Sequence, residues 1–197
     1  MSLEHADLQP TLTGEKLILR PLVSDDWGAM YAVASDPLLW EVHPAFDRYQ
    51  EPVFRIYFAG AMASRGALAV IDHSTGKIVG GSRYANYVAD LNEIEIGWTF
   101  LARSHWGGTY NREMKSLMLT HAFRFFDCIR FNIGATNARS RRAIEKIGAR
   151  YDGEYVPEAI NGVLAVPHAI YRLNRAEARA VNMLLEESDK DGEQIRA

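Results

Sequence analysis

Cysteine is nearly absent from this 197-residue sequence: Cys128 is the one example, so no disulfide can form within the chain. That usage fits a reducing compartment. An excess of charge of either sign is also missing, because 22 basic residues stand against 25 acidic ones and leave a net charge of −3. General nucleic-acid binding needs a basic surface, so this balance argues against that class, although a local basic cluster can still hold an anion.

Long apolar runs are missing as well. None approaches the roughly 18 residues that a membrane-spanning helix needs, and residues 1–16 lack the basic-then-apolar order of a secretory signal. We therefore expect a soluble, cytoplasmic protein with no membrane partner. Its length of 197 residues fits one domain with a sizeable core.

The signatures of several common sites do not occur. The chain contains neither GxxxxGK[ST] nor GxGxxG, which excludes the usual nucleotide phosphate loop and the dinucleotide-binding turn. Its 6 histidines follow no metal-ligand spacing, so we expect no metal. Cys128 lies where a helix is expected to meet a strand, beside apolar residues. A buried structural thiol is favoured there over a nucleophile.

Hydrophobic periodicity and turn residues indicate an alternation of strands and helices. The expected strands are 16–22, 67–72, 77–88, 92–101, 129–136, 150–157 and 165–174, and the expected helices are 24–36, 51–66, 111–126, 138–148 and a last one that starts at 175 and frays into a charged tail. Ser24 is the expected N-cap of the first helix. Because a strand–helix–strand–helix unit follows an antiparallel meander, we expect a mixed α/β domain.

The segment ARSHWGGTYNREMK, residues 102–115, joins an expected strand to an expected helix through Gly107 and Gly108. Such a joint presents unpaired N–H groups and the positive end of a helix dipole, which together bind phosphate well. Thr109 can cap the helix or donate its hydroxyl, and Arg103 and Arg112 add charge nearby. The alternative is a plain turn, which the glycines taken alone slightly favour.

A second segment, ATNARSRRAIEKIGARYDG (135–153), follows the next expected strand. It favours a phosphate site over a plain turn at Gly107 and Gly108. With it, the chain resembles the GNAT family of acyl-CoA-dependent N-acyltransferases, and most of all its RimJ/RimL-like (ribosomal-protein-alanine acetyltransferase-like) branch. LTGEKLILRPLVSDD (12–26), EIGWTFLARSHWGG (95–108) and HAIYRL (168–173) carry the same resemblance. It covers residues 12–174, and leaves 1–11 as an N-terminal extension and 175–197 as a C-terminal helix and charged tail.

The resemblance implies a GNAT acyl-CoA N-acyltransferase fold, of α/β (α+β) class, whose mixed central sheet of about seven strands has helices on both faces. It implies acetyl-CoA as the co-substrate, with the pantetheine arm in a gap where two central strands splay apart. The residues implied to bind CoA are Phe100, Leu101 and Ala102 at the pantetheine and thioester, Trp106, Gly107, Gly108, Thr109, Tyr110 and Asn111 at the pyrophosphate, and Asn137, Ser140 and Arg142 on the next helix.

The chain departs from the family pattern at two places. The usual pyrophosphate turn is [Q/R]xxGx[G/A], and this sequence has Trp106, Thr109 and Asn111 at its defined positions. Asn111 then either donates its side-chain amide or keeps the pyrophosphate away. Many relatives also carry a tyrosine that protonates the CoA thiolate, and here that position is Ile144. Ser140 or water is expected to replace it.

Acyl transfer to an amine requires a neutral nucleophile, so a base is needed. Glu93 and Glu95 fall on one face of the expected strand 92–101. The resemblance favours Glu95 as the base, acting through water, because Glu95 in EIGW matches a glutamate frequent in the family. The alternative is that both are solvated surface charges. A backbone N–H of Phe100 or Leu101 would polarise the carbonyl.

The acceptor is expected to meet Trp40, His43 and Glu93, with plain packing of the aromatic residues as the alternative. We expect a primary amine, either a protein N-terminus or a small molecule such as a polyamine or an aminoglycoside. A different class also remains open, namely a GNAT-fold module that senses acyl-CoA without turnover. The chain is expected to be a monomer or a homodimer.

Overall fold

The computed structural model describes residues 6–156 and 166–185. The strands are β1 (Leu12–Thr13), β2 (Leu17–Pro21), β3 (Ala67–Asp72), β4 (Ile78–Val88), β5 (Glu93–Leu101), β6 (Cys128–Gly134), β7 (Arg150–Tyr155) and β8 (His168–Asn174), and the helices are α1 (Trp27–Ala34), α2 (Glu51–Ala63), α3 (Tyr110–Ala122), α4 (Ala138–Glu145) and α5 (Arg175–Ala180). All these strands form one mixed sheet in the order β1-β2-β3-β4-β5-β6-β8-β7. The 8 strands exceed the expected seven because β1, only 2 residues long, was not predicted.

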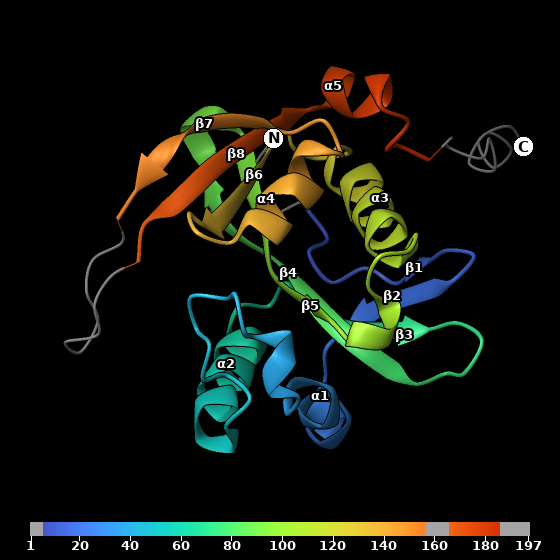
Figure 1. The fold of residues 1–197 in the computed structure, drawn as a ribbon. Coiled ribbons are helices and arrows are strands. Elements are labelled where there is room, and N and C mark those ends of the chain that lie inside the picture. The colour runs from blue at the N-terminus through green and yellow to red at the C-terminus, as the bar shows by residue number, and fades with distance from the viewer. Residues whose placement is uncertain (1–5, 157–165, 186–197) are drawn as a thin grey trace, which may run out of the picture.

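Helices cover both faces of the sheet, as expected. Figure 1 shows α1 and α2 together on one side and α3, α4 and α5 on the other. Each face has its own hydrophobic cluster. Met114, Met118 and Ile144 belong to the cluster on the α3 side, while Met30 and Phe54 belong to the cluster on the α1–α2 side. Burial of these apolar side chains on both faces holds the sheet between its two helical layers.

The sheet opens between β5 and β6, the one parallel pair among the described strands. The pairing consists of Glu93–Cys128, Ile94–Ile129 and Glu95–Arg130, and it ends there. Beyond Glu95, β5 stays paired with β4 up to Leu101 but has no strand on its other side among the described residues. Within this half-strand the carbonyls of Trp98 and Leu101 accept the Tyr57 hydroxyl and the Trp106 indole N–H. The remaining backbone groups on its unpaired edge can bind a ligand in the gap.

An extra residue interrupts β5 in the same stretch. Gly81 pairs with Phe100 and Arg83 pairs with Gly97, so β5 has one residue more than β4 over this interval. Trp98 has a φ of 52°, in the left-handed region. This geometry is that of a β-bulge, a feature that bends a strand and is frequent beside binding sites.

The start of the first helix and the end of the last helix differ from the sequence prediction. The predicted N-cap Ser24 is instead the first residue of a short 3-10 turn, and α1 begins at Trp27. The reason is Asp26, whose carboxylate is buried against Arg20 and accepts the amide of Val23. At the other end, α5 stops at Ala180, and the predicted tail 186–197 lies outside the described residues.

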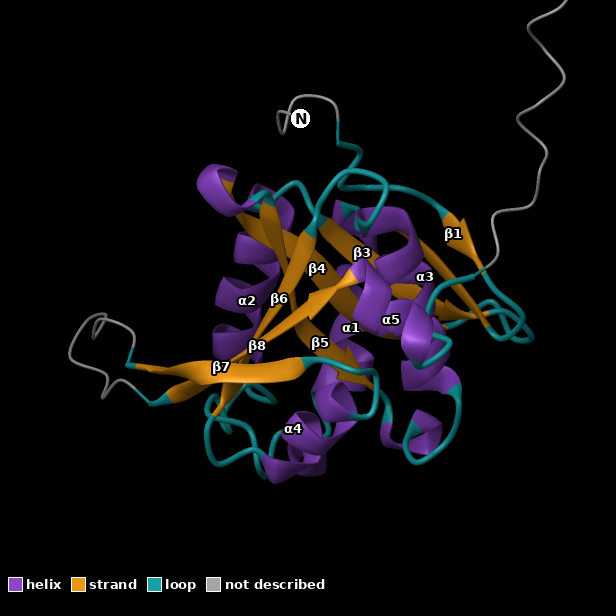
Figure 2. Cartoon of the chain, turned by 90° about the horizontal axis from the view of Figure 1, so that it is seen from above, coloured by secondary structure: helices purple, strands orange, loops and turns teal. Residues whose placement is uncertain are grey.

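The last two strands pair with each other, as predicted, and β8 lies between β6 and β7. Figure 2 shows β7 and β8 side by side at one end of the sheet. The predicted strand residues 157 and 165 lie outside the described part of the chain. Across residues 6–156 and 166–185, every helix is too short or too polar to cross a membrane.

Candidate functional site

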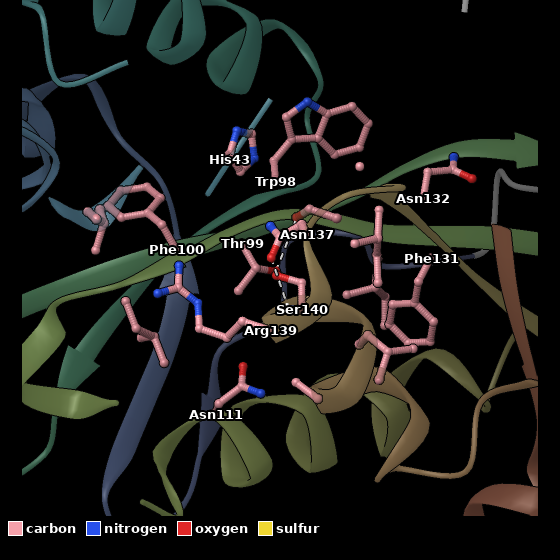
Figure 3. A pocket seen from close by; sticks show the side chains of 18 of the residues that line it. His43, Trp98, Thr99, Phe100, Asn111, Phe131, Asn132, Asn137, Arg139 and Ser140 are labelled. Carbon is pink, nitrogen blue, oxygen red and sulfur yellow. Dashed lines mark hydrogen bonds between the residues drawn. The ribbon is translucent and has the colours of Figure 1, made fainter. Parts of the chain in front are cut away.

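A cavity of about 300 Å³ lies where β5 and β6 separate. It reaches from α3 and α4 on one face of the sheet to the segment between α1 and α2 on the other. Its lining includes Trp40, His43, Trp98, Thr99, Phe100, Leu101, Trp106, Gly107, Asn111, Lys115, Asn132, Asn137, Arg139, Ser140 and Ile144. In Figure 3, Asn111 on α3 and His43 lie at opposite ends of the view, with Thr99, Asn137 and Ser140 between them.

The predicted pyrophosphate turn forms one end of the cavity. Gly107 has a φ of 71°, which glycine tolerates, and α3 begins three residues later at Tyr110. The first amides of this 13-residue helix have no partner within the helix. The indole N–H of Trp106 donates to the carbonyl of Leu101 at 2.8 Å and fixes the turn against β5.

The residues of that turn do not all reach the cavity. Asn111 lines it together with Trp106 and Gly107. Gly108, Thr109 and Tyr110 are not among the lining residues, and the side chain of Thr109 does not cap α3. Ala102, predicted to line the pantetheine, is also outside the lining, and its N–H donates to the carbonyl of Val79.

The start of α4 forms a second wall. Asn137 is buried, and its Oδ1 accepts the amide of Ser140 at 3.1 Å, which caps the helix. Both residues line the cavity, as predicted. Arg142 is exposed and outside the lining, whereas Arg139 lines it and places its guanidinium 3.8 Å from the centre of the Trp106 ring.

The two arginines predicted to add charge near the turn are engaged elsewhere. Arg103 pairs with Asp36 at 2.5 Å, and the guanidinium beside Asp36 lowers the pKa of that carboxyl. Arg112 donates to the carbonyls of Val181 and Asn182. Arg139 is therefore the arginine that the structure brings to the turn, and sequence reasoning missed it.

Glu95 is a buried carboxylate just behind the cavity wall. The residue is 4% exposed, so the alternative of a solvated surface charge is wrong. Oε2 accepts the side-chain amides of Asn132 at 2.7 Å and Asn86 at 2.8 Å, with Arg130 at 3.5 Å. Burial raises the pKa of Glu95 above its ordinary value, against these contacts.

One layer of atoms separates this carboxylate from the cavity. Glu95 itself is not a lining residue, but Gly97 and Asn132 are. A Cβ atom at Gly97 would stand 3.0 Å from Glu95 Oε1, so the carboxylate lies directly against that glycine. This position fits a base that acts through a bridging water.

Glu93 lies outside the cavity and is completely buried. Its carboxylate pairs with Arg172 Nε at 2.5 Å and with Arg130 Nη1 at 3.2 Å, and it accepts the thiol of Cys128 at 3.5 Å. These contacts join β5 to β6 and β8. The structure therefore does not bring Glu93 to the predicted substrate site, and it makes the surface-charge alternative wrong here too.

Cys128, expected to be a buried structural thiol, is half-buried. Burial and the neighbouring carboxylate of Glu93 raise the pKa of its thiol to about 11. A thiol of that pKa stays protonated at neutral pH and is a poor nucleophile.

Trp40 and His43 form the wall opposite α3. Trp40 is buried, donates its indole N–H to the carbonyl of Ala34 at 2.7 Å, and also lines the cavity, so it both packs and faces the site. His43 accepts the amide of Ala45 at Nδ1. Burial, helped by the charge of Arg48, lowers the pKa of His43 to about 3. His43 is then neutral at pH 7, with its proton on Nε2 as a donor.

Lys115 is a cavity residue that sequence reasoning missed. It is 3% exposed, and its Nζ donates to Thr99 Oγ1 at 2.8 Å. Burial lowers the pKa of Lys115 to about 7. A sequence signal existed, because Met118 and Leu119, three and four residues on, are apolar and buried on the same stripe of α3.

His105 also lines the cavity. Its Nε2 lies 3.3 Å from Asp72 Oδ2 and its ring packs edge-on against Tyr110. Within residues 6–156 and 166–185, His, Cys, Asp and Glu side chains form no group of three or more that could hold a metal ion.

Residues 16–150 match the family model described as acetyltransferase (GNAT) domain. Solved structures share the fold. A GCN5-related N-acetyltransferase of Brucella melitensis superimposes with a TM-score of 0.72 at 20% identity over 99% of this chain and 97% of that one. A GNAT-family acetyltransferase of Bacillus anthracis gives 0.68 at 21% identity over 84% and 98%.

Mycobacterium smegmatis RimJ, solved in complex with CoA-disulfide, gives a TM-score of 0.65 at 20% identity over 85% of this chain and 87% of that one. Identities of this size show a common fold. Among curated proteins, no sequence matches the chain.

Proposed function

The chain belongs to the GNAT acetyltransferase family, and on that premise we propose that it transfers the acetyl group of acetyl-CoA to a primary amine by direct attack in a ternary complex. The observation that carries the proposal is the cavity that passes through the open seam between β5 and β6. It allows one reactant to enter from the α3–α4 side and the other from the α1–α2 side.

The residues present fit acetyl-CoA, which supplies an activated acetyl group. Asn111 and the free amides at the start of α3 would hold the pyrophosphate, with Arg139 as the cation. The edge of β5 that no described strand pairs beyond Glu95 would offer its remaining backbone groups to the pantetheine amides. Ser140 lines the same passage.

Glu95 would remove the proton from the acceptor amine through a water. Asn86 and Asn132 hold its carboxylate in place from β4 and β6. Its raised pKa makes it a better proton acceptor than an ordinary glutamate near neutral pH. Backbone N–H groups of Phe100 or Leu101 would polarise the acetyl carbonyl.

The acceptor would be a protein N-terminal amine, as in the RimJ/RimL-like branch, or a small amine. The sequence resemblance supports that branch, whereas the likeness to Mycobacterium smegmatis RimJ supports the fold. We place the acetyltransferase domain at residues 12–174 and the protein in the cytoplasm, as a monomer or homodimer without nucleic-acid or membrane partners.

A second candidate is a module that binds acyl-CoA without turnover. Ile144 favours it, because this residue lines the cavity where many relatives carry a proton-donating tyrosine. A thermal-shift titration with acetyl-CoA, combined with a free-thiol assay over a pooled amine panel, separates the candidates. We expect acetyl-CoA to raise Tm and at least one amine to release thiol. Stabilisation without thiol release would support the sensor, and no stabilisation by any acyl-CoA would oppose both.

The pyrophosphate turn yields a paired prediction. Asn111→Ala should raise the Kd for acetyl-CoA about tenfold, because it removes one hydrogen bond to a charged group. Thr109→Ala should leave the Kd within about twofold, since Thr109 does not line the cavity. Isothermal titration calorimetry measures both constants. Tighter binding by Asn111→Ala would mean that Asn111 keeps the pyrophosphate out.

A further inference from the structure

Lys115 occupies an unusual position for a lysine. It lies in the first half of α3, is 3% exposed, and lines the cavity near the bulge of β5. Its Nζ has one hydrogen-bond partner among the described residues, Thr99 Oγ1 at 2.8 Å. Thr99 Oγ1 in turn lies 2.8 Å from Ser82 Oγ on β4. The ammonium thus has donors to spare, because three N–H groups meet one protein acceptor.

Within the described part of the chain, no carboxylate forms an ion pair with this ammonium. The elements around it present Thr99 from β5, Phe131 from β6, with its ring centre 5.8 Å from Nζ, and Ile144 from α4. The acidic residue nearest in sequence, Glu113, accepts the backbone amides of Lys16 and Leu17 instead. The other titratable or cationic lining residues are His43, His105, Arg139 and His168, and none of them bonds to Lys115.

Such a residue lowers the stability of the fold. Burial of an unpaired ammonium is unfavourable, and a methionine of similar length would fill the same space without that cost. The desolvation shows in the pKa of Lys115, which falls from 10.5 to about 7. Groups perturbed in this way and facing a cavity concentrate at functional sites.

We propose that Lys115 is the proton donor to the thiolate of CoA. The inference rests on the proposed acetyl transfer. As the amine nitrogen forms its bond to the acetyl carbon, the carbon–sulfur bond breaks and its electron pair stays on sulfur. The ammonium of Lys115 gives a proton to that sulfur, and the resulting neutral amine regains a proton from solvent. The proton lost by the attacking amine leaves through Glu95, so atoms and charge balance.

The other candidates for this role are weaker acids. Ile144 carries no acidic proton, although it lines the cavity where a donor is expected. Ser140 lines the cavity too, but a serine hydroxyl holds its proton well above neutral pH. Lys115 releases a proton near pH 7, slightly below the pKa of about 8.5 for a free thiol. An acid matched to the pH of the reaction and to its acceptor is the efficient one.

The first test uses Lys115→Met with the amine acceptor found in the panel. We expect kcat to fall about 100-fold, as for removal of a general acid, while acetyl-CoA still raises Tm. A donor must be protonated, so wild-type activity should decline as pH rises through about 7, the pKa of Lys115, and the variant should lose this alkaline limb. Ser140→Ala should keep the limb. Lys146→Met, the same change at an exposed lysine, is the control.

The second test needs no acceptor. NMR of protein labelled at the lysine ε position should show one resonance titrating near pH 7, absent from Lys115→Met. Ultraviolet absorbance of bound CoA should show thiolate at a lower pH in the wild type than in the variant, because a nearby ammonium stabilises it. Intact mass measured after incubation with acetyl-CoA should show no acetyl group on Lys115.

Stability gives a third readout. Lys115→Met should raise Tm, and wild-type stability should increase with pH between about 7 and 10.5, because only the unfolded state still binds the proton there. The variant should not show that increase.

This role would be overturned if the wild type transfers the acetyl group and Lys115→Met keeps the same kcat and the same alkaline limb. It would also be overturned if the CoA thiol titrates at the same pH in both proteins, or if Lys115 becomes acetylated. No acetyl-CoA binding by the wild type would instead overturn the proposed function.

Discussion

Glu95→Gln is expected to lower kcat/KM for the amine acceptor by about 100- to 1000-fold, the usual loss when a positioned base is removed. Glutamine keeps the shape of the side chain and one oxygen for the amides of Asn86 and Asn132. Glu95 is buried directly against Gly97, which lines the cavity at the open seam. Steady-state kinetics at saturating acetyl-CoA measure the loss.

The pH profile separates a base from a positioning residue. A base must be unprotonated, and the pKa of Glu95 is raised by burial, so wild-type kcat/KM should fall as pH drops through that raised pKa. In Glu95→Gln this acid limb should vanish, while the Kd for acetyl-CoA stays the same. An unchanged profile in the variant would assign the base elsewhere. Glu93→Gln, the same change two residues earlier on the same face, is the matched comparison.

Glu93→Gln is expected to act on stability and to destabilise the protein by about 3 kcal/mol, because it leaves two guanidiniums near a buried site without their anion. Glu93 is fully buried and pairs with both Arg130 and Arg172. This loss of stability is at the low end of that expected for breaking a buried ion pair. The reason is that Arg172 is one-third exposed and keeps Asp152 as a partner. Urea unfolding measures the change, and a loss of about 3 kcal/mol would lower Tm by roughly 6–12 °C.

Kinetic measurements on Glu93→Gln test whether Glu93 also contacts the acceptor. Once Glu93→Gln is assayed well below its Tm, we expect the KM for the acceptor to match the wild type, since Glu93 does not line the cavity. Full stability together with a raised acceptor KM would return Glu93 to the substrate site that the sequence first indicated.

The strands were predictable because their alternation and turn residues are local signals. The burial of Glu93 and Glu95 could not be predicted from the sequence. Alternating charged and apolar residues usually mean one wet face, yet here the polar face meets Arg130 and Arg172, which stand 37 and 79 residues after Glu93 in the chain. Only the order of strands, in which β6 lies beside β5 and β8 lies beside β6, brings these partners together.

The cavity residues divide in the same way. Asn137 was named from the family resemblance, and its place at the start of α4 is local in sequence, since helix caps follow a local rule. The sequence could not decide between Arg139 and Arg142. That choice depends on which side of the short helix α4 faces Trp106. Lys115 was missed because a lysine is normally assigned to solvent. Its burial depends on Thr99 and Phe131, which belong to other elements.

The bulge at Trp98 shifts the phase of β5. Before it, the even-numbered Ile94 and Ile96 face α3, and after it, Thr99 and Leu101 do. With an unbroken two-residue period, Thr99 would fall on the same face as Glu95, and Phe100 would meet Lys115. Because of this one extra residue, β5 presents the carboxylate of Glu95 to one face of the sheet and the hydroxyl of Thr99, which holds Lys115, to the other. With the proposed roles of Glu95 and Lys115, this extra residue would keep the two proton transfers on opposite sides of the sheet.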